Sequence, residues 1–491
     1  MKKYFILASM FAMLSCACNN GKNPQPEPDP DPVPVVRMAD VYTTTRSMSK
    51  IFTASQVELT DAAESSTAVY LDPSTKYQTI DGFGAAMTWA TCYNIQRMPE
   101  ADRAKLMTEL FDREKGLGIS LVRVTVGASD FNKEEYTWCD TEGLENFKID
   151  KRDEDVVIPV LKEMYKINPD VKIIASPWSV PMWMKMGVGG SGKHNQWTSG
   201  RLDPKYYQAY ADYYVKWIQV MQGYGFKIAA LTPQNEPLNH GNSMSTYMPW
   251  KDQRDFVKVL GPALEKAGLD TKIILFDHNY DYDNMADQKN YPLNIYKDAE
   301  ANKYSAGSAW HDYGGTVREL DNIMLNAPDK EIYFTESSIG TWNYSWESCI
   351  LSHFKNIFLE TMKRGCKGVT LWNMVLDDQK GPYSPQAGSC KTCYGAVEVS
   401  SKDFKVTTRR THYYQIAHAS KVVKPGAVRI GTSGFSKAGV TCMAFQNPDG
   451  SYAVLALNES ASDTTVRFVS KGHSVKVTLP EGSITSVIWK D

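Results

Sequence analysis

Two short stretches decide the fold that this sequence predicts. They are Leu231-Thr-Pro-Gln-Asn-Glu-Pro237 and, about a hundred residues later, Ile332-Tyr-Phe-Thr-Glu-Ser-Ser338. In each, a short apolar run stops at a glutamate that is followed by turn-prone residues, which predicts a buried strand with a carboxylate at its C-terminal end. Two carboxylates at the same end of a barrel suit the hydrolysis of a glycosidic bond. Glu236 and Glu336 are therefore the candidate catalytic residues.

Strand and helix patterns alternate around these two stretches. One predicted helix covers residues 204–221, with Asp203 as its N-cap and Pro204 at its first position, and another covers residues 349–364. Eight such strands joined by helices predict an α/β fold, a (β/α)8 barrel over residues 80–396. The strands are expected at residues 80–85, 119–126, 171–177, 228–233, 272–276, 305–310, 331–335 and 368–372.

A second domain is expected at the C-terminus. After about Val397 the helix patterns stop, and Asn447-Pro-Asp-Gly450 is a strong turn signal between short alternating strands. Residues 397–491 therefore predict a β-sandwich, and strands within residues 38–79 are expected to join it. The C-terminal strands are expected at residues 428–430, 441–445, 452–458, 464–469, 475–479 and 485–489.

Length and composition fit this plan. The chain has 491 residues, of which 42% are hydrophobic and 22% charged, as in ordinary globular proteins. The net charge of -2 gives no reason to expect nucleic acid as a partner. Aromatic residues make up 11% of the chain, which suits either a well-packed core or a cleft that stacks on sugar rings.

The N-terminus has the pattern of a targeting segment. Residues 1–18 combine two lysines, a short apolar core and the Leu14-Ser15-Cys16 box of a bacterial lipoprotein signal peptide. Cys16 would carry the lipid, with Cys18 as a second candidate, and a plain secretory signal is the alternative. Residues 19–37 are a Pro-rich linker. We expect an exported protein, lipid-anchored to the bacterial outer membrane on its outer or periplasmic face.

The chain has nine cysteines, and two of them form the tight pair Cys390-Lys-Thr-Cys393. The pair could be a disulfide, a redox pair or half of a zinc site. Because no second paired-cysteine unit follows and export permits disulfides, we favour a disulfide that braces a loop.

The two glutamates take different roles in a retaining glycosidase. Glu236 fits the acid/base and Glu336 the nucleophile, since the ends of the fourth and seventh strands face each other across a barrel mouth. Asn235 is placed to hydrogen-bond a sugar 2-hydroxyl. A single glutamate is usually a solvated surface charge, but two at strand ends favour catalysis.

The sequence resembles glycoside hydrolase family 30, which contains glucosylceramidase and microbial β-1,6-glucanases. The resemblance covers residues 78–489 and implies retaining hydrolysis of β-glucosides without a metal or other cofactor, on a barrel with a β-sandwich. Its marks are Asp81-Gly-Phe-Gly-Ala-Ala-Met87, Leu121-Val-Arg-Val124, Ser129-Asp-Phe131, Ala175-Ser-Pro-Trp-Ser179, Pro233-Gln-Asn-Glu-Pro237, Trp310-His-Asp-Tyr313, Phe334-Thr-Glu-Ser337 and Leu371-Trp-Asn373.

The resemblance also implies roles for individual residues. Arg123 would hold a catalytic carboxylate and keep it ionised. The walls and hydrogen-bond donors of the sugar subsite would be Trp178, His311, Tyr313 and Trp372. For each of these, a structural role in the core is the alternative.

One departure from the glucosylceramidase-like pattern bears on the substrate. That pattern has Gly-Phe-Gly-Gly-Ala followed after a short step by an aspartate, whereas this chain continues from Gly84 to Trp89 as Gly-Ala-Ala-Met-Thr-Trp. Trp89 would offer a stacking face where the aspartate would grip hydroxyls, which favours a β-glucan chain over a glycolipid. The loop of residues 380–394 is expected to rim the cleft.

The leading functional hypothesis is a retaining endo-β-1,6-glucanase. The alternatives within the enzymes are an exo-acting β-glucosidase, a glucosylceramidase-like enzyme, and activity on β-xylosides or β-fucosides. From another class, the chain could be a surface glycan-binding lipoprotein without activity, although a binder needs no pair of carboxylates. A monomer is assumed.

Overall fold

The computed structural model describes residues 37–281, 284–342 and 344–491. The predicted signal peptide with Cys16 and Cys18, and residues 19–36 of the Pro-rich linker, lie outside the described residues. Within the described ranges, no helix is both long and apolar enough to cross a membrane.

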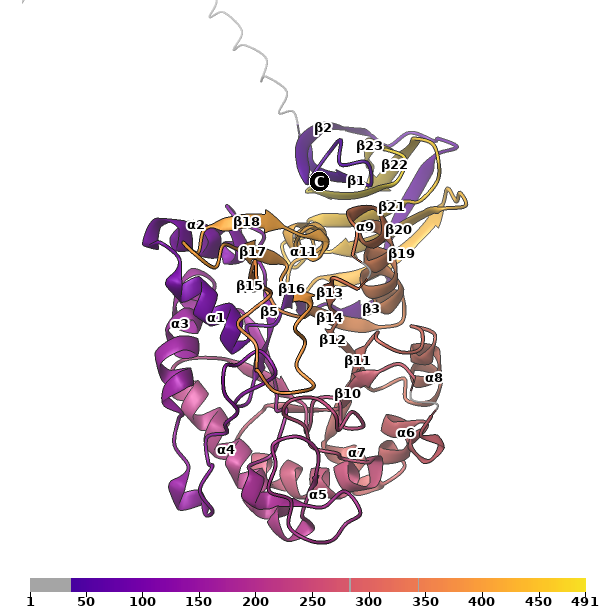
Figure 1. The fold of residues 1–491 in the computed structure, drawn as a ribbon. Coiled ribbons are helices and arrows are strands. Elements are labelled where there is room, and N and C mark those ends of the chain that lie inside the picture. The colour runs from indigo at the N-terminus through magenta and orange to yellow at the C-terminus, as the bar shows by residue number, and fades with distance from the viewer. Residues whose placement is uncertain (1–36, 282–283, 343) are drawn as a thin grey trace, which may run out of the picture. The chain divides into compact units, whose positions relative to one another are not determined.

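The barrel is built from eight parallel strands in the order β4-β14-β12-β11-β10-β9-β6-β5 (Figure 1). Its first and last strands meet through a parallel bridge between Ala86 and Arg123, and the Met87 N–H donates to the Arg123 carbonyl at 2.8 Å. All eight predicted strands are present, so the predicted barrel is confirmed. They are β4 (Gly82–Ala85), β5 (Leu121–Thr125), β6 (Lys172–Ser176), β9 (Ile228–Leu231), β10 (Lys272–Asn279), β11 (Ser305–His311), β12 (Glu331–Glu336) and β14 (Cys366–Leu371).

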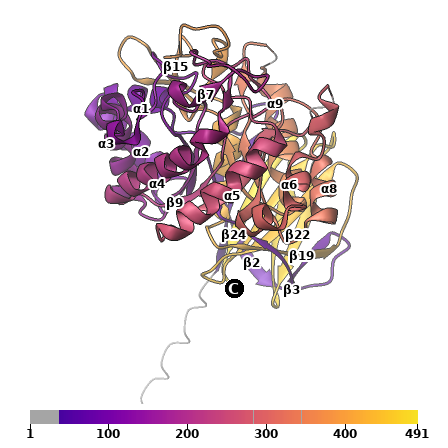
Figure 2. The same ribbon diagram turned by 90° about the horizontal axis from the view of Figure 1, so that it is seen from below.

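Helices surround the barrel strands (Figures 1 and 2). The predicted N-cap is observed: the Asp203 carboxylate accepts from the Lys205 N–H, and Pro204 opens a short turn that leads into α4. The helices are α1 (Trp89–Arg97), α2 (Glu100–Phe111), α3 (Ile158–Ile167), α4 (Tyr207–Gly223), α5 (Trp250–Lys266), α6 (Tyr291–Tyr296), α7 (Ala299–Tyr304), α8 (Glu319–Asn326), α9 (Trp346–His353), α10 (Glu360–Lys363) and α11 (Thr411–Val422).

Two layers of side chains fill the barrel, because residues two apart on a strand share a face. The lower layer is an apolar cluster of Leu121, Ile174, Ala230, Ile274, Ala309 and Tyr333. Two positions further along five of these strands, the side chains are polar and joined by hydrogen bonds. This upper layer contains Arg123, Ser176, Thr232, His311 and Thr335, with Asp277 from β10.

Strand β10 breaks the alternation. Its register shifts between Phe276 and His278, and Phe276 and Asp277 have left-handed backbones with φ of 72° and 64°. Alternation from Ile274 would turn Phe276 inward, but this bulge brings Asp277 into the polar layer instead. Phe276 packs against Tyr291 and Trp310.

The second domain combines both ends of the described chain. Nine strands pair into a closed ring, in which β1 pairs with β24 and β2 with β23. In Figure 1 the indigo N-terminal strands accordingly lie among the yellow C-terminal ones. The strands are β1 (Met38–Thr45), β2 (Thr53–Asp61), β3 (Ala68–Thr79), β19 (Val428–Gly434), β20 (Val440–Gln446), β21 (Tyr452–Asn458), β22 (Thr464–Ser470), β23 (His473–Leu479) and β24 (Ser483–Trp489).

Helix α11 corrects the expectation that helices stop after about Val397. The helix is buried nearly all round, so its sequence shows no amphipathic stripe. Its polar residues find partners on both sides. The Gln415 amide donates to the Cys349 and Ile350 carbonyls, and the two ring nitrogens of His418 each lie 2.8 Å from a hydroxyl of the sandwich, on Thr44 and Ser486.

Candidate active site

A cavity of about 420 Å³ opens at the C-terminal ends of the barrel strands. This is the end at which (β/α)8 barrels carry their active sites. Most of the residues predicted for the sugar site line the cavity. They are Trp178, Asn235, Glu236, Tyr313, Glu336 and Trp372. Two more, Arg123 and His311, are fully buried and contact the glutamates.

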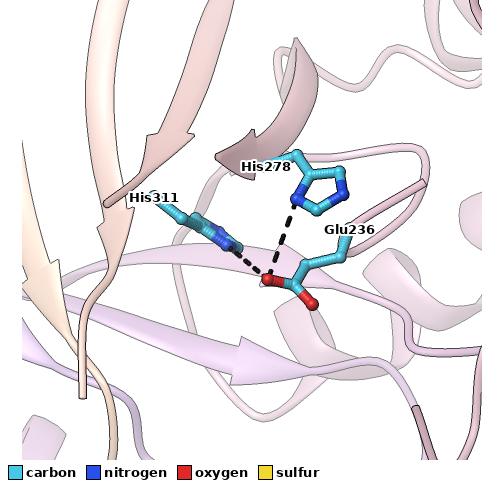
Figure 3. Close-up of side chains that lie close together, drawn as sticks. All are labelled: Glu236, His278 and His311. Carbon is cyan, nitrogen blue, oxygen red and sulfur yellow. Dashed lines mark hydrogen bonds and ion pairs between the residues drawn. The ribbon is translucent and has the colours of Figure 1, made fainter. Parts of the chain in front are cut away.

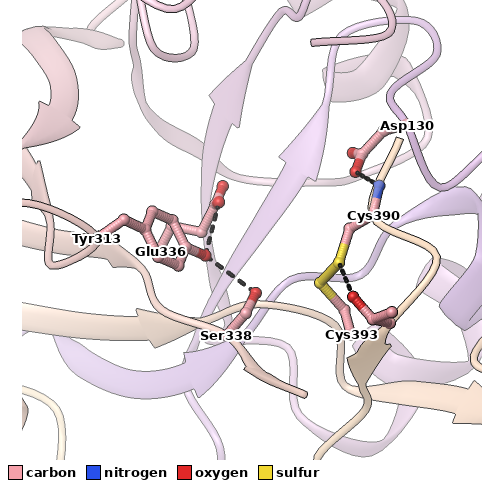
Figure 4. The surroundings of a disulfide bond; sticks show 7 residues. Asp130, Tyr313, Glu336, Ser338, Cys390 and Cys393 are labelled. Carbon is pink, nitrogen blue, oxygen red and sulfur yellow. Dashed lines mark hydrogen bonds between the residues drawn. A yellow bond between two sulfur atoms is a disulfide. The ribbon is translucent and has the colours of Figure 1, made fainter. Parts of the chain in front are cut away.

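Glu336 is the last residue of β12, and both of its carboxylate oxygens accept hydrogen bonds. Arg123 Nη1 donates to Oε2 at 2.5 Å. The Tyr313 hydroxyl donates to Oε1 at 3.0 Å (Figure 4). Burial raises the pKa of Glu336 above its ordinary value, against the opposing effects of His311 and Arg123. The donor set suits an ionised carboxylate.

Glu236 follows β9 with a left-handed backbone, at φ 44°, and its N–H donates to the Asp277 carbonyl at 2.9 Å. The side-chain amides of Asn239 and Asn242 donate to its Oε2 at 2.8 and 2.9 Å. His311 Nδ1 lies 3.2 Å from its Oε1. Burial raises the pKa of Glu236, but the His311 hydrogen bond and the charges of both neighbouring histidines outweigh it and hold the pKa at about 2.

Asp277 contacts both Arg123 and His311, the residues that hold the two glutamates. No role was predicted for it from the sequence. Its Oδ2 accepts from Arg123, Ser176 and Thr232 at 2.7–2.8 Å, and its Oδ1 accepts from Thr335 and lies 3.1 Å from His311 Nε2. The signal that marked Glu236 and Glu336 was present here too, because Asp277 directly follows the apolar run of residues 273–276.

His311 lies between two carboxylates. Nδ1 faces Glu236 and Nε2 faces Asp277, and although burial lowers its pKa, the negative charge of Glu336 and these two contacts raise the pKa to about 9. His278 Nδ1 lies 3.8 Å from the same Glu236 oxygen, and burial lowers its pKa to about 4. Figure 3 shows both rings directed at that oxygen.

These three residues are also where the site could accept a metal ion. Among the described residues, one group of three side chains brings metal-ligand atoms within 4.8 Å of one another, and it consists of Glu236, His278 and His311.

Aromatic rings form one wall of the cavity. Trp178 and Trp372 stack with centroids 5.1 Å apart and an interplanar angle of 20°. The Arg123 guanidinium carbon lies 4.9 Å from the Trp178 ring centroid, and Arg123 Nη2 donates to Asn235 Oδ1 at 2.6 Å. Arg123 therefore positions an aromatic wall and an amide as well as Glu336.

Trp89 does not take the predicted place. It is the first residue of α1, its ring stacks on Tyr93 with centroids 4.9 Å apart, and its Nε1–H donates to the Arg152 carbonyl at 3.2 Å. It is not among the described residues that line the cavity. Because Thr88 caps α1 and directs the chain into the helix, the next side chain packs in the core instead of stacking on a substrate.

The loop of residues 380–394 rims the cavity as predicted, with Gly388 and Ser389 in the lining. Cys390 and Cys393 form a disulfide with Cα atoms 5.8 Å apart, which confirms the favoured interpretation of that pair. The Cys390 N–H donates to Asp130 Oδ2 at 3.3 Å (Figure 4).

Asp130 and Trp342 also line the cavity without having been assigned a role from the sequence. Burial raises the pKa of Asp130 to about 8. Trp342 is 51% exposed, which is unusual for a tryptophan. Asp130 could have been found within Ser129-Asp-Phe131, whereas no strand or motif marks Trp342.

Comparison with known proteins agrees with this architecture. Residues 80–423 match the glycosyl hydrolase family 30 TIM-barrel domain, and residues 426–487 match the family 30 beta sandwich domain. A solved structure titled the endo-beta1,6-glucanase BT3312 shares 47% sequence identity at a TM-score of 0.90, covering 92% of this chain and 99% of that one.

The names of two curated relatives give different activities. Endo-1,6-beta-D-glucanase BGN16.3 of Trichoderma harzianum is 32% identical over 439 residues, which is 84% of this chain and 85% of that protein. Putative glucosylceramidase 1 of Caenorhabditis elegans is 30% identical over 452 residues, 85% of this chain and 82% of that protein. The barrel, the sandwich and the two glutamates in one cavity thus identify the chain as a glycoside hydrolase that belongs to glycosyl hydrolase family 30.

Proposed function

We propose that this enzyme cleaves β-1,6-linked glucan internally, by a retaining double displacement. The observation that carries the proposal is that Glu236 and Glu336 share one cavity while each is held by a different cation, His311 and Arg123. The similarity to proteins named endo-1,6-β-glucanases, one at 47% identity over nearly its whole length, supports the choice of linkage.

Glu336 is proposed as the nucleophile. Arg123 and Tyr313 each donate to one of its oxygens, and the ionised form accepts both bonds. Attack on the anomeric carbon would form a glycosyl-enzyme intermediate, which water then hydrolyses.

Glu236 is proposed as the acid/base, although its own pKa is about 2. Both ring nitrogens of His311 face carboxylates. One proton therefore lies between His311 Nδ1 and Glu236 Oε1, bound to one of these two atoms. Transfer across this contact leaves a neutral imidazole and a protonated Glu236. The acid that the leaving oxygen needs is thus stored in the pair.

The cavity walls suit a chain of glucose units. Trp178 and Trp372 offer a stacked wall beside the glutamates, Asn235 is held by Arg123, and Asp130 offers a carboxyl for sugar hydroxyls. Tyr313, whose hydroxyl donates to Glu336, and Trp342 are 44% and 51% exposed, and both belong to the lining. Exposed aromatic faces there would stack on glucose units beyond the one that is attacked, which favours internal cleavage.

The test is a comparison of glucans. The protein is incubated with β-1,6-, β-1,3- and β-1,4-glucan and with glucosylceramide, and early products are separated by chromatography. A ladder of oligosaccharides from the β-1,6 polymer alone supports the proposal. Glucose as the sole early product would make the enzyme exo-acting, and release of ceramide alone would favour the glucosylceramidase-like alternative.

The roles of the glutamates are tested separately. Glu336→Gln should lower kcat by about a thousandfold or more, and unchanged turnover would refute the nucleophile. Glu236→Ala should be most harmful with poor leaving groups and be partly restored by azide. Equal loss on activated and natural substrates, without azide rescue, would exclude the acid/base role.

Export and lipid anchoring are proposed from the N-terminal sequence alone. Mass spectrometry of membrane fractions should find the mature N-terminus at Cys16 with attached acyl chains, and Cys16→Ala should abolish them. Lipidation that persists in Cys16→Ala would shift the proposal to Cys18.

A further inference from the structure

We propose that Glu236, His278 and His311 form an inhibitory binding site for a divalent transition-metal ion of the Zn²⁺ type. Binding itself depends only on the geometry of the three side chains, whereas inhibition rests on the proposed acid/base role of Glu236. An ion there would occupy the oxygen of Glu236 that faces His311, so this site would oppose the reaction.

The three ligand atoms have the spacing of a zinc site. Oε1 of Glu236 lies 3.2 Å from His311 Nδ1 and 3.8 Å from His278 Nδ1, and all three atoms lie within 4.8 Å of one another (Figure 3). Zinc bonds of about 2.0–2.1 Å at tetrahedral angles separate neighbouring ligands by about 3.3 Å. Small side-chain rotations would therefore close the set around an ion, with a fourth position left for water.

The surrounding residues already orient these ligands. Asp277 Oδ1 faces His311 Nε2 at 3.1 Å, which directs the other ring nitrogen at Glu236. This is the carboxylate–histidine arrangement that commonly supports histidine ligands of zinc. Asn239 and Asn242 both donate to Oε2 of Glu236, so that Oε1 remains directed at the two imidazoles.

The donor atoms select the class of ion. Two imidazole nitrogens and one carboxylate oxygen suit Zn²⁺, Co²⁺ or Cu²⁺, whereas Mg²⁺ and Ca²⁺ prefer oxygen ligands. Glu236 lines the cavity, which gives an ion a path from solvent. Asp277 and Glu336, which share the single positive charge of Arg123, lie near His311 and leave negative charge beside an incoming dication.

Binding requires the loss of a proton. The ion would take the Nδ1 lone pair and Oε1, the two atoms between which the acid proton lies, so one proton leaves for each ion bound.

The first experiment needs no substrate. Purified full-length protein is titrated with Co²⁺, and the visible absorption of four-coordinate Co²⁺ is followed until Zn²⁺ displaces it. One ion per chain is expected in the wild type. His278→Gln and His278→Asn should each weaken binding by about tenfold or more. The matched control is His240→Gln, an exposed histidine on the loop that follows Glu236, which should bind as the wild type does.

The second experiment measures glucan hydrolysis with Zn²⁺, Mg²⁺ or a chelator, each variant being compared with its own metal-free rate. Zn²⁺ should inhibit reversibly and Mg²⁺ should not, and the His278 variants should tolerate about tenfold more Zn²⁺. Absence of Co²⁺ absorption in the wild type, or binding that the His278 variants leave unchanged, would overturn the proposed site. Metal binding without inhibition would instead count against the role of Glu236.

Discussion

The two layers inside the barrel come from the same strands, two residues apart, yet they have different functions. The lower layer is apolar, and the hydroxyl of its Tyr333 donates to Asp81 at 2.6 Å. The upper layer places Arg123, Asp277 and His311 in full burial and links them by hydrogen bonds. The lower layer stabilises the barrel, and the upper one holds the catalytic carboxylates.

The upper layer is stable only as a whole. Burying an ion is costly unless partners surround it, and removing one partner of a buried ion pair typically costs about 3–5 kcal/mol. Arg123 is shared between Asp277 and Glu336, and His311 between Asp277 and Glu236. Changes in the upper layer should therefore alter catalysis and its pH dependence, whereas changes in the lower layer should alter stability alone.

Among the changes that compare the two layers, the largest effect is expected for Asp277→Asn. The change removes the negative charge shared by Arg123 and His311, so kcat should fall by about a hundredfold and the free energy of unfolding by about 3 kcal/mol. Steady-state kinetics and thermal denaturation measure the two quantities.

The matched control is Asp81→Asn, which alters a carboxylate that is also paired, with Lys172 and the Tyr333 hydroxyl. It should lower stability but leave kcat unchanged. If Asp81→Asn reduced kcat as strongly as Asp277→Asn, the division of work between the layers would be wrong.

A medium effect is expected from pH. The pKa of His311 is about 9 in the folded protein and 6.5 ordinarily, so the stabilisation by its protonated form is complete below pH 6.5 and lost as the pH rises through 9. The free energy of unfolding should decline by up to about 1.4 kcal/mol per pH unit over that window. Activity should fall above about pH 9, when the Glu236–His311 contact loses its proton.

Asp130, whose pKa is about 8, titrates in the same cavity and provides the control. The alkaline loss of activity should persist in Asp130→Asn and move to lower pH in Asp277→Asn, because His311 then faces one carboxylate fewer. An alkaline loss that disappeared in Asp130→Asn would assign it to Asp130 instead of His311.

The smallest effects compare single side chains, one from each layer. Thr335→Val keeps the shape but removes the hydroxyl that donates to Asp277 at 2.7 Å, and it should lower kcat by about tenfold. Ile274→Val removes one methylene from the apolar layer and should cost about 1 kcal/mol of stability while kcat stays the same. If Thr335→Val and Ile274→Val lowered kcat equally, the proposed difference between the layers would be wrong.

Local pattern was sufficient for the strands and for the two glutamates. Strands that are buried on both faces have continuous apolar runs. Glu336 is the last residue of such a strand, and Glu236 follows another in the loop after β9. Local pattern failed for α11, because a helix buried nearly all round has no amphipathic stripe. The comparison with the family pattern failed for Trp89, because a helix start directs that side chain into the core.

Asp277 shows where alternation alone misleads. Counting from Ile274 places Phe276 inside the barrel, and the bulge that exchanges it for Asp277 depends on left-handed backbone angles at both residues. Such backbone angles are strained for residues other than glycine, and they persist only where surrounding contacts enforce them. Those contacts come from β5, β6, β11 and β12, far away in the sequence.

The sequence by itself determined the barrel, the strands of the second domain and the two strand ends that carry Glu236 and Glu336. The reason is that hydrophobic periodicity and turn residues act over a few positions. The tertiary structure alone decided which buried charges share protons and added Asp130 and Trp342 to the lining of the cavity. Pairing of buried charges depends on distances between strands that lie far apart in the chain, and no local pattern records those distances.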